Sequence, residues 1–182
     1  MNTKREYMTA KWLIAFGLCL FAAAGGAAAG PISGCTLPQG LDNEVAKKFP
    51  SAHLVSLADL DDYKKKLYKK DHGSRCPGLV RVNFYGDGKA TWALVLISGE
   101  NPKRKAELVV ARQLDAEWEI RSLETTDGTP VVWREGPGKY DGMNDNKTIH
   151  ASNPVIVFCG YGSWAVVYAW NGKEVEKVWI SD

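Results

Sequence analysis

The chain contains few of the residues from which catalytic and metal sites are usually built. Its 182 residues include three histidines, and none of them lies at zinc-ligand spacing from another histidine or from a cysteine. The G-x-S-x-G nucleophile motif is missing, and so is any motif for a nucleotide, haem or flavin. These absences predict no cofactor, no metal and no catalytic residues, and they favour a non-catalytic protein over an enzyme.

The chain also lacks an apolar run long enough to cross a membrane, which takes about 20 residues. The longest uncharged apolar run, Trp12–Ala24, has about 13 residues. Lys4, Arg5 and Lys11 precede it and small residues follow, an order typical of a secretory signal. We therefore expect residues 1–29 to be a signal peptide. The remainder, 30–182, is expected to be a single domain exported by a bacterium to the periplasm or the cell exterior.

Two processing sites compete at the end of this signal. Ala27 and Ala29 form the A-x-A pattern of ordinary signal peptidase, which leaves Gly30 as the first mature residue. The sequence Ile-Ser-Gly-Cys that ends at Cys35 instead resembles a bacterial lipobox, in which Cys35 carries a lipid. We favour ordinary cleavage because Gly30 and Pro31 separate the lipobox from the apolar core. Membrane attachment is expected only if Cys35 is lipidated.

The cysteine count is low and becomes odd once the signal is removed. Of the four cysteines, Cys19 lies in the predicted signal, which leaves Cys35, Cys76 and Cys159 in an oxidising compartment. If cleavage follows Ala29, we expect a disulfide between Cys35 and Cys76 and a buried thiol at Cys159. If Cys35 carries a lipid, Cys76 and Cys159 form the remaining intrachain pair.

The mature region has no excess of charge of either sign. Lys4, Arg5 and Lys11 against Glu6 account for the whole formal net charge of +2, so the residues after 30 sum to zero. A neutral chain has no general attraction for nucleic acid or anionic membranes. We therefore expect no nucleic-acid partner, and predict an unidentified protein or small ligand. The basic run 64–70 is interpreted as the solvated face of a helix.

Two short helices are predicted near the start of the mature region. Residues 42–49 and about 59–70 carry apolar residues at helical spacing. In the second helix, Leu60, Tyr63 and Leu67 form the expected buried face. His72, just beyond, is expected at its solvated end.

From Leu79 onward the apolar pattern changes to the two-residue period of β-strands. Eight such runs occur: 79–85, 91–98, 106–112, 117–123, 130–135, 154–159, 163–170 and 174–181. With no helix between them, antiparallel pairing is expected. The predicted fold is α+β, with a helical segment at 30–78 and an antiparallel β region at 79–182. The strands are expected to form a sandwich or two propeller-blade-like sheets, and 136–146 the longest irregular loop.

One turn carries a motif. The segment Asn83–Lys89 (NFYGDGK) joins two predicted strands, and the Y-x-W-x-G ending after Tyr168 has a similar strand-turn-strand pattern. Residues 79–97 and 163–182 thereby resemble FG-GAP/VCBS-type repeats of uncharacterised exported bacterial proteins. That resemblance implies a calcium loop, with Asn83 and Asp87 as candidate ligands. Calcium prefers six to eight oxygen ligands and this loop has one carboxylate, so we favour a glycine hairpin.

The preferred functional interpretation is an exported binding protein, of the inhibitor or immunity type, whose partner no residue identifies. The first alternative is a hydrolase acting on envelope glycans, with Glu117 and Glu119 or the long loop forming its cleft. The second is a degenerate propeller-like module stabilised by calcium. A row formed by Trp164, Tyr168 and Trp170 would stack on sugars if exposed, and we expect it in the core.

The intact mass of the exported protein tests the cleavage and disulfide predictions together. We expect the mass of the chain from Gly30 to Asp182 with one disulfide, so that reduction adds two hydrogen atoms. A chain that starts at Cys35 and carries a lipid mass would contradict cleavage after Ala29 and the pairing of Cys35 with Cys76.

Overall fold

The computed structural model describes residues 35–100, 102–143 and 147–181. The chain divides into two units, Met1–Gly30 and Pro31–Asp182, and the description below concerns the second. The predicted signal peptide, residues 1–29, lies outside the described residues. Neither helix of the described part has the length and apolar character needed to cross a membrane.

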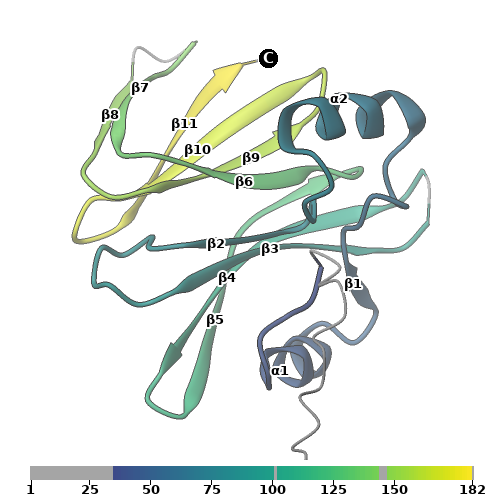
Figure 1. The fold of residues 1–182 in the computed structure, drawn as a ribbon, viewed down its shortest axis with the longest axis horizontal. Coiled ribbons are helices and arrows are strands. Elements are labelled where there is room, and N and C mark those ends of the chain that lie inside the picture. The colour runs from purple at the N-terminus through teal and green to yellow at the C-terminus, as the bar shows by residue number, and fades with distance from the viewer. Residues whose placement is uncertain (1–34, 101, 144–146, 182) are drawn as a thin grey trace, which may run out of the picture. The chain divides into compact units, whose positions relative to one another are not determined.

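The described chain consists mostly of antiparallel β-sheet, with two helices (Figure 1). Its elements are α1 (Leu41–Lys48), β1 (Ala52–Leu54), α2 (Asp62–His72), β2 (Leu79–Val82), β3 (Thr91–Ser98), β4 (Lys105–Leu114), β5 (Glu117–Asp127), β6 (Val131–Glu135), β7 (Gly138–Asp141), β8 (Thr148–Ala151), β9 (Val155–Gly160), β10 (Trp164–Trp170) and β11 (Val175–Ser181). The prediction of a β-rich, antiparallel fold with two helices is confirmed.

The strands form two sheets and a small ribbon. Sheet A has the order β1-β3-β4-β5, and β2 pairs with β3 beyond the end of β1. Sheet B has the order β11-β10-β9-β6. The ribbon, β7 with β8, lies partly within 136–146, so the prediction of an irregular loop there was wrong. Its strands are short and mostly polar, and apart from Ile149 and Tyr140 they contribute few of the apolar residues that signal a strand.

Three apolar clusters fix the order of the layers. The largest lies between the two sheets and includes Phe84, Val95, Phe158 and Tyr168. A second joins α1 to the outer face of sheet A, and a third joins the β7–β8 ribbon to the outer face of sheet B. Because both sheets are covered on both faces, β3, β9 and β10 are buried almost throughout, which explains their continuous apolar runs.

Helix α2 is present but presents a different face to the core than the sequence predicted. Its N-terminus is capped by Asp61, whose carboxylate accepts a hydrogen bond from the backbone N–H of Lys64 at 2.8 Å. Tyr63, expected to be buried, is 64% exposed, whereas Tyr68 is 1% exposed. Leu60 lies before the helix begins, so counting it as helical shifted the predicted face. Burial raises the pKa of Tyr68 to about 12, and its hydroxyl donates to the carbonyl oxygen of Cys76 at 3.0 Å.

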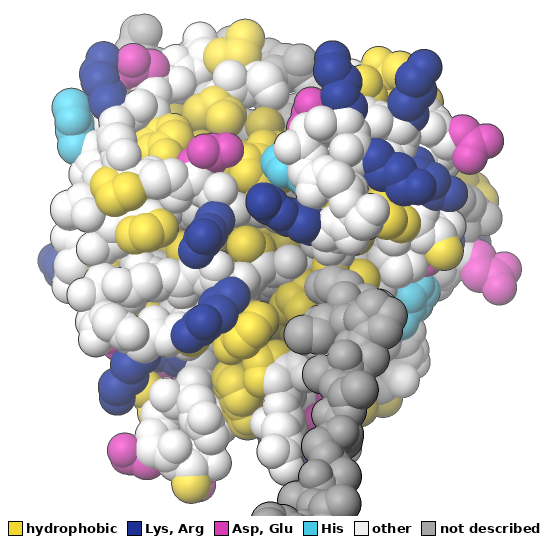
Figure 2. Space-filling model, viewed as in Figure 1, with side chains coloured by type: hydrophobic (Ala, Val, Ile, Leu, Met, Phe, Trp, Pro, Cys, Tyr) yellow, Lys and Arg dark blue, Asp and Glu magenta, His cyan; other side chains and the backbone are white. Residues whose placement is uncertain are grey.

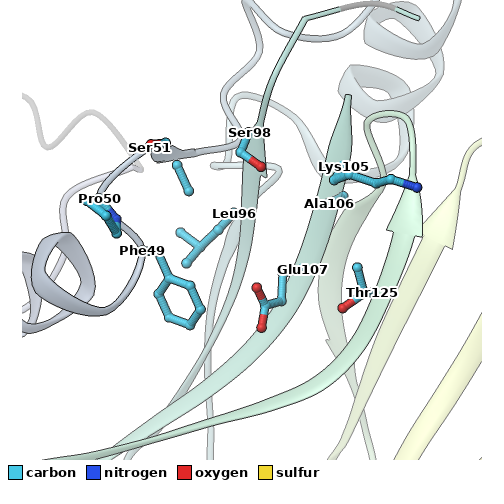
Figure 3. A pocket seen from close by; sticks show the side chains of 10 residues that line it. Phe49, Pro50, Ser51, Leu96, Ser98, Lys105, Ala106, Glu107 and Thr125 are labelled. Carbon is cyan, nitrogen blue, oxygen red and sulfur yellow. The ribbon is translucent and has the colours of Figure 1, made fainter. Parts of the chain in front are cut away.

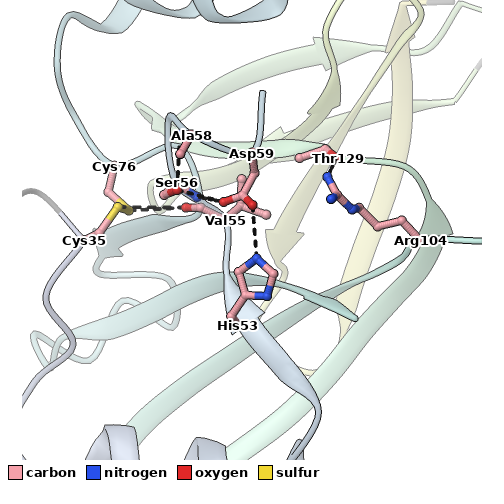
Figure 4. Close-up of polar contacts among 9 residues, drawn as sticks. All are labelled: Cys35, His53, Val55, Ser56, Ala58, Asp59, Cys76, Arg104 and Thr129. Carbon is pink, nitrogen blue, oxygen red and sulfur yellow. Dashed lines mark hydrogen bonds and ion pairs between the residues drawn. A yellow bond between two sulfur atoms is a disulfide. The ribbon is translucent and has the colours of Figure 1, made fainter. Parts of the chain in front are cut away.

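A disulfide and close backbone contacts around Val55 join the amino-terminal segment to the sheets (Figure 4). Cys35 and Cys76 form a disulfide, the pairing expected for cleavage after Ala29, and both sulfur atoms contact the carbonyl oxygen of Val55. The same oxygen accepts the N–H of Gly78 at 3.0 Å, and the N–H of Val55 donates to Val95 of β3. We call this the Val55–Gly78 junction. It places the start of β2 against β3.

Polar contacts hold the turn that follows the junction. The carboxylate of Asp59 accepts hydrogen bonds from the N–H of Ser56 at 2.8 Å and from its hydroxyl at 2.7 Å, and it pairs with His53 at 3.1 Å. Burial alone would raise the pKa of Asp59, but these hydrogen bonds lower it below its ordinary value. The turn from Val55 to the start of α2 is thereby fixed.

Opposite edges of the two sheets are tied in different ways. On one side, the N–H of Val132 in β6 donates to the carbonyl oxygen of Pro77 at 2.8 Å. On the other side, the buried Tyr168 of β10 donates to Glu124 of β5 at 2.8 Å, and Lys177 pairs with the same carboxylate at 2.5 Å. Burial would raise the pKa of Glu124, yet these contacts lower it.

Replacing Gly78 by alanine tests the junction. A Cβ atom there would lie 2.5 Å from the carbonyl oxygen and 2.8 Å from the nitrogen of Val55, and backbone atoms have little freedom to move. We expect Gly78→Ala to lower the free energy of unfolding by about 1–3 kcal/mol in urea titrations. Gly136→Ala is the matched control, because a Cβ at Gly136 meets no atom within 4 Å. Equal stability of the two variants would contradict the tight packing at Gly78.

A candidate binding cleft lined by arginine and aromatic residues

A cleft of about 790 Å³ opens where the neighbouring edges of the two sheets separate. Its sides are Leu79–Arg81 of β2, Val132–Glu135 of β6, and the end of α2 with the residues that follow, from Tyr68 to Cys76. The Val55–Gly78 junction holds all three elements at the closed end, since Pro77 bonds to β6 and Cys76 to α2. We call this the arginine cleft.

Strand alternation places two of the arginines in the cleft. Val80 and Val82 pack towards the core between the sheets, so Arg81 projects from the other face of β2. Its guanidinium lies 6.0 Å from the ring centre of Trp92, its partner on β3. Arg134 is exposed on β6 after two buried valines, and Arg75 follows the end of α2.

The arginines of the cleft lack acidic partners. Among the described residues, Arg75, Arg81 and Arg134 take part in no ion pair. The two acids that line the cleft instead bind neutral donors. The hydroxyl of Tyr161 donates to Asp71 at 3.3 Å, and the indole N–H of Trp133 donates to Glu135 at 2.8 Å. Figure 2 shows Lys and Arg side chains in dark blue around a hollowed apolar surface on this face.

An aromatic stack forms one wall of the arginine cleft. The ring centre of His72 lies 4.8 Å from that of Trp133 and 4.9 Å from that of Tyr68, and Tyr161 packs edge-on against both Tyr68 and His72. His72 is therefore half-buried, and its prediction as a solvated helix end was wrong. Burial lowers the pKa of His72, opposed by Asp71 and Glu135 and reinforced by Arg75, so the ring is mostly neutral at pH 7.

The arginine cleft continues along the β2–β3 hairpin. A hollow of about 160 Å³ shares Arg81 and Arg134 with it and adds Lys89. A further hollow of about 620 Å³ shares Lys89 and Trp92 and reaches Trp118. Together they make an elongated surface with four basic side chains and flat aromatic rings at its sides.

A smaller hollow of about 190 Å³ lies between the end of α1 and the outer face of sheet A (Figure 3). Phe49 and Leu96 line its apolar part, and Glu107 points towards Phe49. Its charges already have partners: Glu107 accepts the hydroxyl of Ser122, and Lys105 pairs with Asp127 at 2.6 Å. This hollow therefore offers little free charge for a ligand.

The candidate calcium residues lie in a closed turn. The side-chain oxygen of Asn83 accepts the N–H of Gly88 at 3.2 Å, and that of Asp87 accepts the N–H of Lys89 at 2.9 Å. Gly86 and Gly88 supply the positive φ angles of the turn. No group of three or more His, Cys, Asp or Glu side chains among the described residues is arranged to hold a metal. Calcium binding by Asn83 and Asp87 stays a prediction.

The other residues singled out in the sequence lie apart from the arginine cleft. Glu119 of β5 pairs with Arg112 at 2.5 Å and Glu117 is exposed, and neither lines a hollow described above. Tyr168 is buried between the sheets, with Trp164 and Trp170 packed beside it. Cys159 is a buried free thiol, and burial raises its pKa to about 11.

Sequence reasoning missed the residues that form the cleft. Arg75, Arg81, Arg134 and Trp133 come from three segments, and no motif links them. The available signal was an arginine at a solvent-facing position inside two otherwise apolar strands, VRV and VWR. That signal is too common to select a site without the fold.

No protein-family model, no curated protein and no solved structure matched this chain. The cleft is therefore interpreted from its own geometry and chemistry.

The half-buried position of His72 predicts a pH-dependent stability. Its folded-state pKa lies below the ordinary value of 6.5, so between the two values the unfolded chain binds more protons. Stability should therefore fall as the pH drops through and below 6.5. We expect His72→Gln to lose less unfolding free energy than the unchanged protein between about pH 7 and about pH 5 in urea titrations.

His150→Gln is the matched control for this experiment, because His150 is exposed on β8. It should keep the pH dependence of the unchanged protein. A His72→Gln variant with the same pH dependence as this control would contradict the assignment.

Proposed function

We propose that this protein is an exported, non-catalytic binding protein, periplasmic or extracellular, that holds an anionic ligand in the arginine cleft. The observation that carries the proposal is a set of three arginines around one cleft that form no ion pair within the described part of the chain, beside acids that already bind neutral donors. Export is supported by the disulfide between Cys35 and Cys76, because such bonds persist in oxidising compartments.

The chemistry of the cleft suits an anion with an apolar or planar part. Each guanidinium presents a planar fork of donors that matches a carboxylate or phosphate group. Like charges gathered in one cleft repel one another, so an anionic ligand relieves an unfavourable interaction in the free protein. Trp133 and His72, whose ring planes are tilted by 38°, supply aromatic rings against which the apolar part can pack.

A glycan hydrolase is less well supported by the geometry. Such an enzyme needs two carboxyl groups facing each other across the scissile bond. Glu119 is held by Arg112, and Asp71 and Glu135 are held by Tyr161 and Trp133. These three carboxylates thus have partners, while the arginines of the cleft form no ion pair among the residues that the structure describes, which favours binding over acid–base chemistry.

We also propose that the two sheets form a sandwich rather than two propeller-blade units. Support comes from the largest apolar cluster, to which both sheets contribute one face. The likeness of residues 79–97 and 163–182 to FG-GAP/VCBS-type repeats then concerns the hairpins β2–β3 and β10–β11, one in each sheet.

Calorimetry with three anions tests the binding proposal: tripolyphosphate, oligogalacturonate and an acidic peptide. We expect at least one to bind with an affinity that falls as salt is added. The double variant Arg81→Ala/Arg134→Ala should weaken that binding by about tenfold or more, because each hydrogen bond to a charged group contributes about 1.5–3 kcal/mol.

The matched control for this experiment is Arg121→Ala, which removes the same charge from a separate hollow on β5. It should bind as the unchanged protein does. Binding of none of the three anions, or equal weakening in the control, would contradict the proposal.

A further inference from the structure

The arginine cleft also contains an unpaired strand edge. Strand β6 is the last strand of sheet B and pairs with β9 alone. The N–H of Val132 bonds to Pro77 and therefore points away from β9. Since backbone groups alternate in direction along a strand, the N–H and C=O of Arg134 point the same way, into the cleft. No backbone partner for Arg134 on this side is present among the described residues.

The facing edge, β2, is also open towards the cleft. The carbonyl oxygen of Gly78 accepts the N–H of Val95, so by alternation the backbone groups of Val80 and Val82 also point towards β3. Those of Leu79 and Arg81 point the other way by the same alternation. Among the described residues, the bond from Val132 to Pro77 is the one backbone hydrogen bond at this seam. Valines of both strands pack into the core between the sheets, and the two ribbons separate beyond that bond in Figure 1.

Resting on the proposed function, we propose that the anionic ligand is an extended acidic segment of a partner protein, which pairs with β6 as an added strand. The open N–H and C=O of Arg134 offer a donor and an acceptor to one residue of an extended polypeptide, and strand addition to such an edge is a common form of peptide recognition. A sugar or phosphate chain has no backbone amide to pair with both groups. The free arginines select acidic side chains over neutral ones.

The two faces of β6 predict the sequence of the partner segment. Trp133 stacks on His72 on one face of the strand, and Arg134 lies on the other. Side chains of an added strand alternate between the same two faces. The segment should therefore alternate apolar residues, which pack beside Trp133, with acidic residues, which reach Arg134. Arg81, across the cleft on β2, is available to further carboxylates.

The experiment uses a synthetic peptide of alternating Asp and Val and the whole exported domain. In an added strand, the N–H groups of one residue type face β6 and those of the other face away. We therefore expect peptide binding to weaken at least tenfold when the backbone nitrogens of one residue type, Asp or Val, are methylated. Methylation of the backbone nitrogens of the other type should leave peptide binding unchanged. Arg134→Ala should also weaken binding of the parent peptide, and Arg121→Ala should not.

Hydrogen exchange provides a second measurement on the unmodified protein. Binding of the parent peptide should slow exchange of the Arg134 amide, while amides along β5, the far edge of sheet A, keep their rates.

Each other outcome has a definite meaning. Equal binding of both methylated peptides and the parent would overturn strand addition and leave the anion site intact. Tight binding of oligogalacturonate without binding of the peptide would overturn the peptide proposal in favour of an acidic glycan. Failure of the peptide, oligogalacturonate and tripolyphosphate alike would overturn the proposed function itself.

Discussion

The close backbone contact between Val55 and Gly78 is the constraint on which the rest of the structure depends. Val55 binds β3 through its N–H and Gly78 through its carbonyl oxygen, and only a residue without a side chain fits at position 78. The neighbours of Gly78 then make the remaining connections: Pro77 binds β6, and Cys76 binds both Cys35 and Tyr68. One short segment thus sets the positions of the amino-terminal chain, α2 and both sheets.

The arginine cleft is a direct result of this arrangement. The sheets are held together at Pro77 and Val132, and the opposite edges, β5 and β11, are joined through Glu124 and Lys177. Beyond the first contact, β2 and β6 diverge, because each sheet follows its own partner strands. The space between β2 and β6 is lined by the side chains that alternate away from the core on these strands. These side chains include arginines, and they lie beside the aromatic cluster of Trp133 and His72. A cleft of this kind needs no dedicated loop.

The sequence predicted the elements better than their contacts. All eight strand predictions correspond to observed strands. The buried strands keep long runs of Val, Ile and Leu, and the more exposed β5 and β11 keep an apolar–polar alternation in part of their length. The prediction of which face of α2 is buried was wrong, because the helix has few apolar residues and Leu60 lies outside it. The role of His72 was missed for a related reason, since its burial depends on Trp133, far along the chain. Local patterns record the period of a strand or helix, but not which distant residue packs against it.

The disulfide has a further consequence for where the arginine cleft forms. The covalent loop between Cys35 and Cys76 contains α1, β1 and α2, so one wall of the cleft belongs to a segment that oxidation secures. Before oxidation, that segment would be held by non-covalent contacts alone, with a larger loss of chain entropy on ordering. Assembly of the cleft is therefore linked to the redox potential of the surroundings. In a chain kept among cytoplasmic thiols, this wall of the cleft would be less firmly in place.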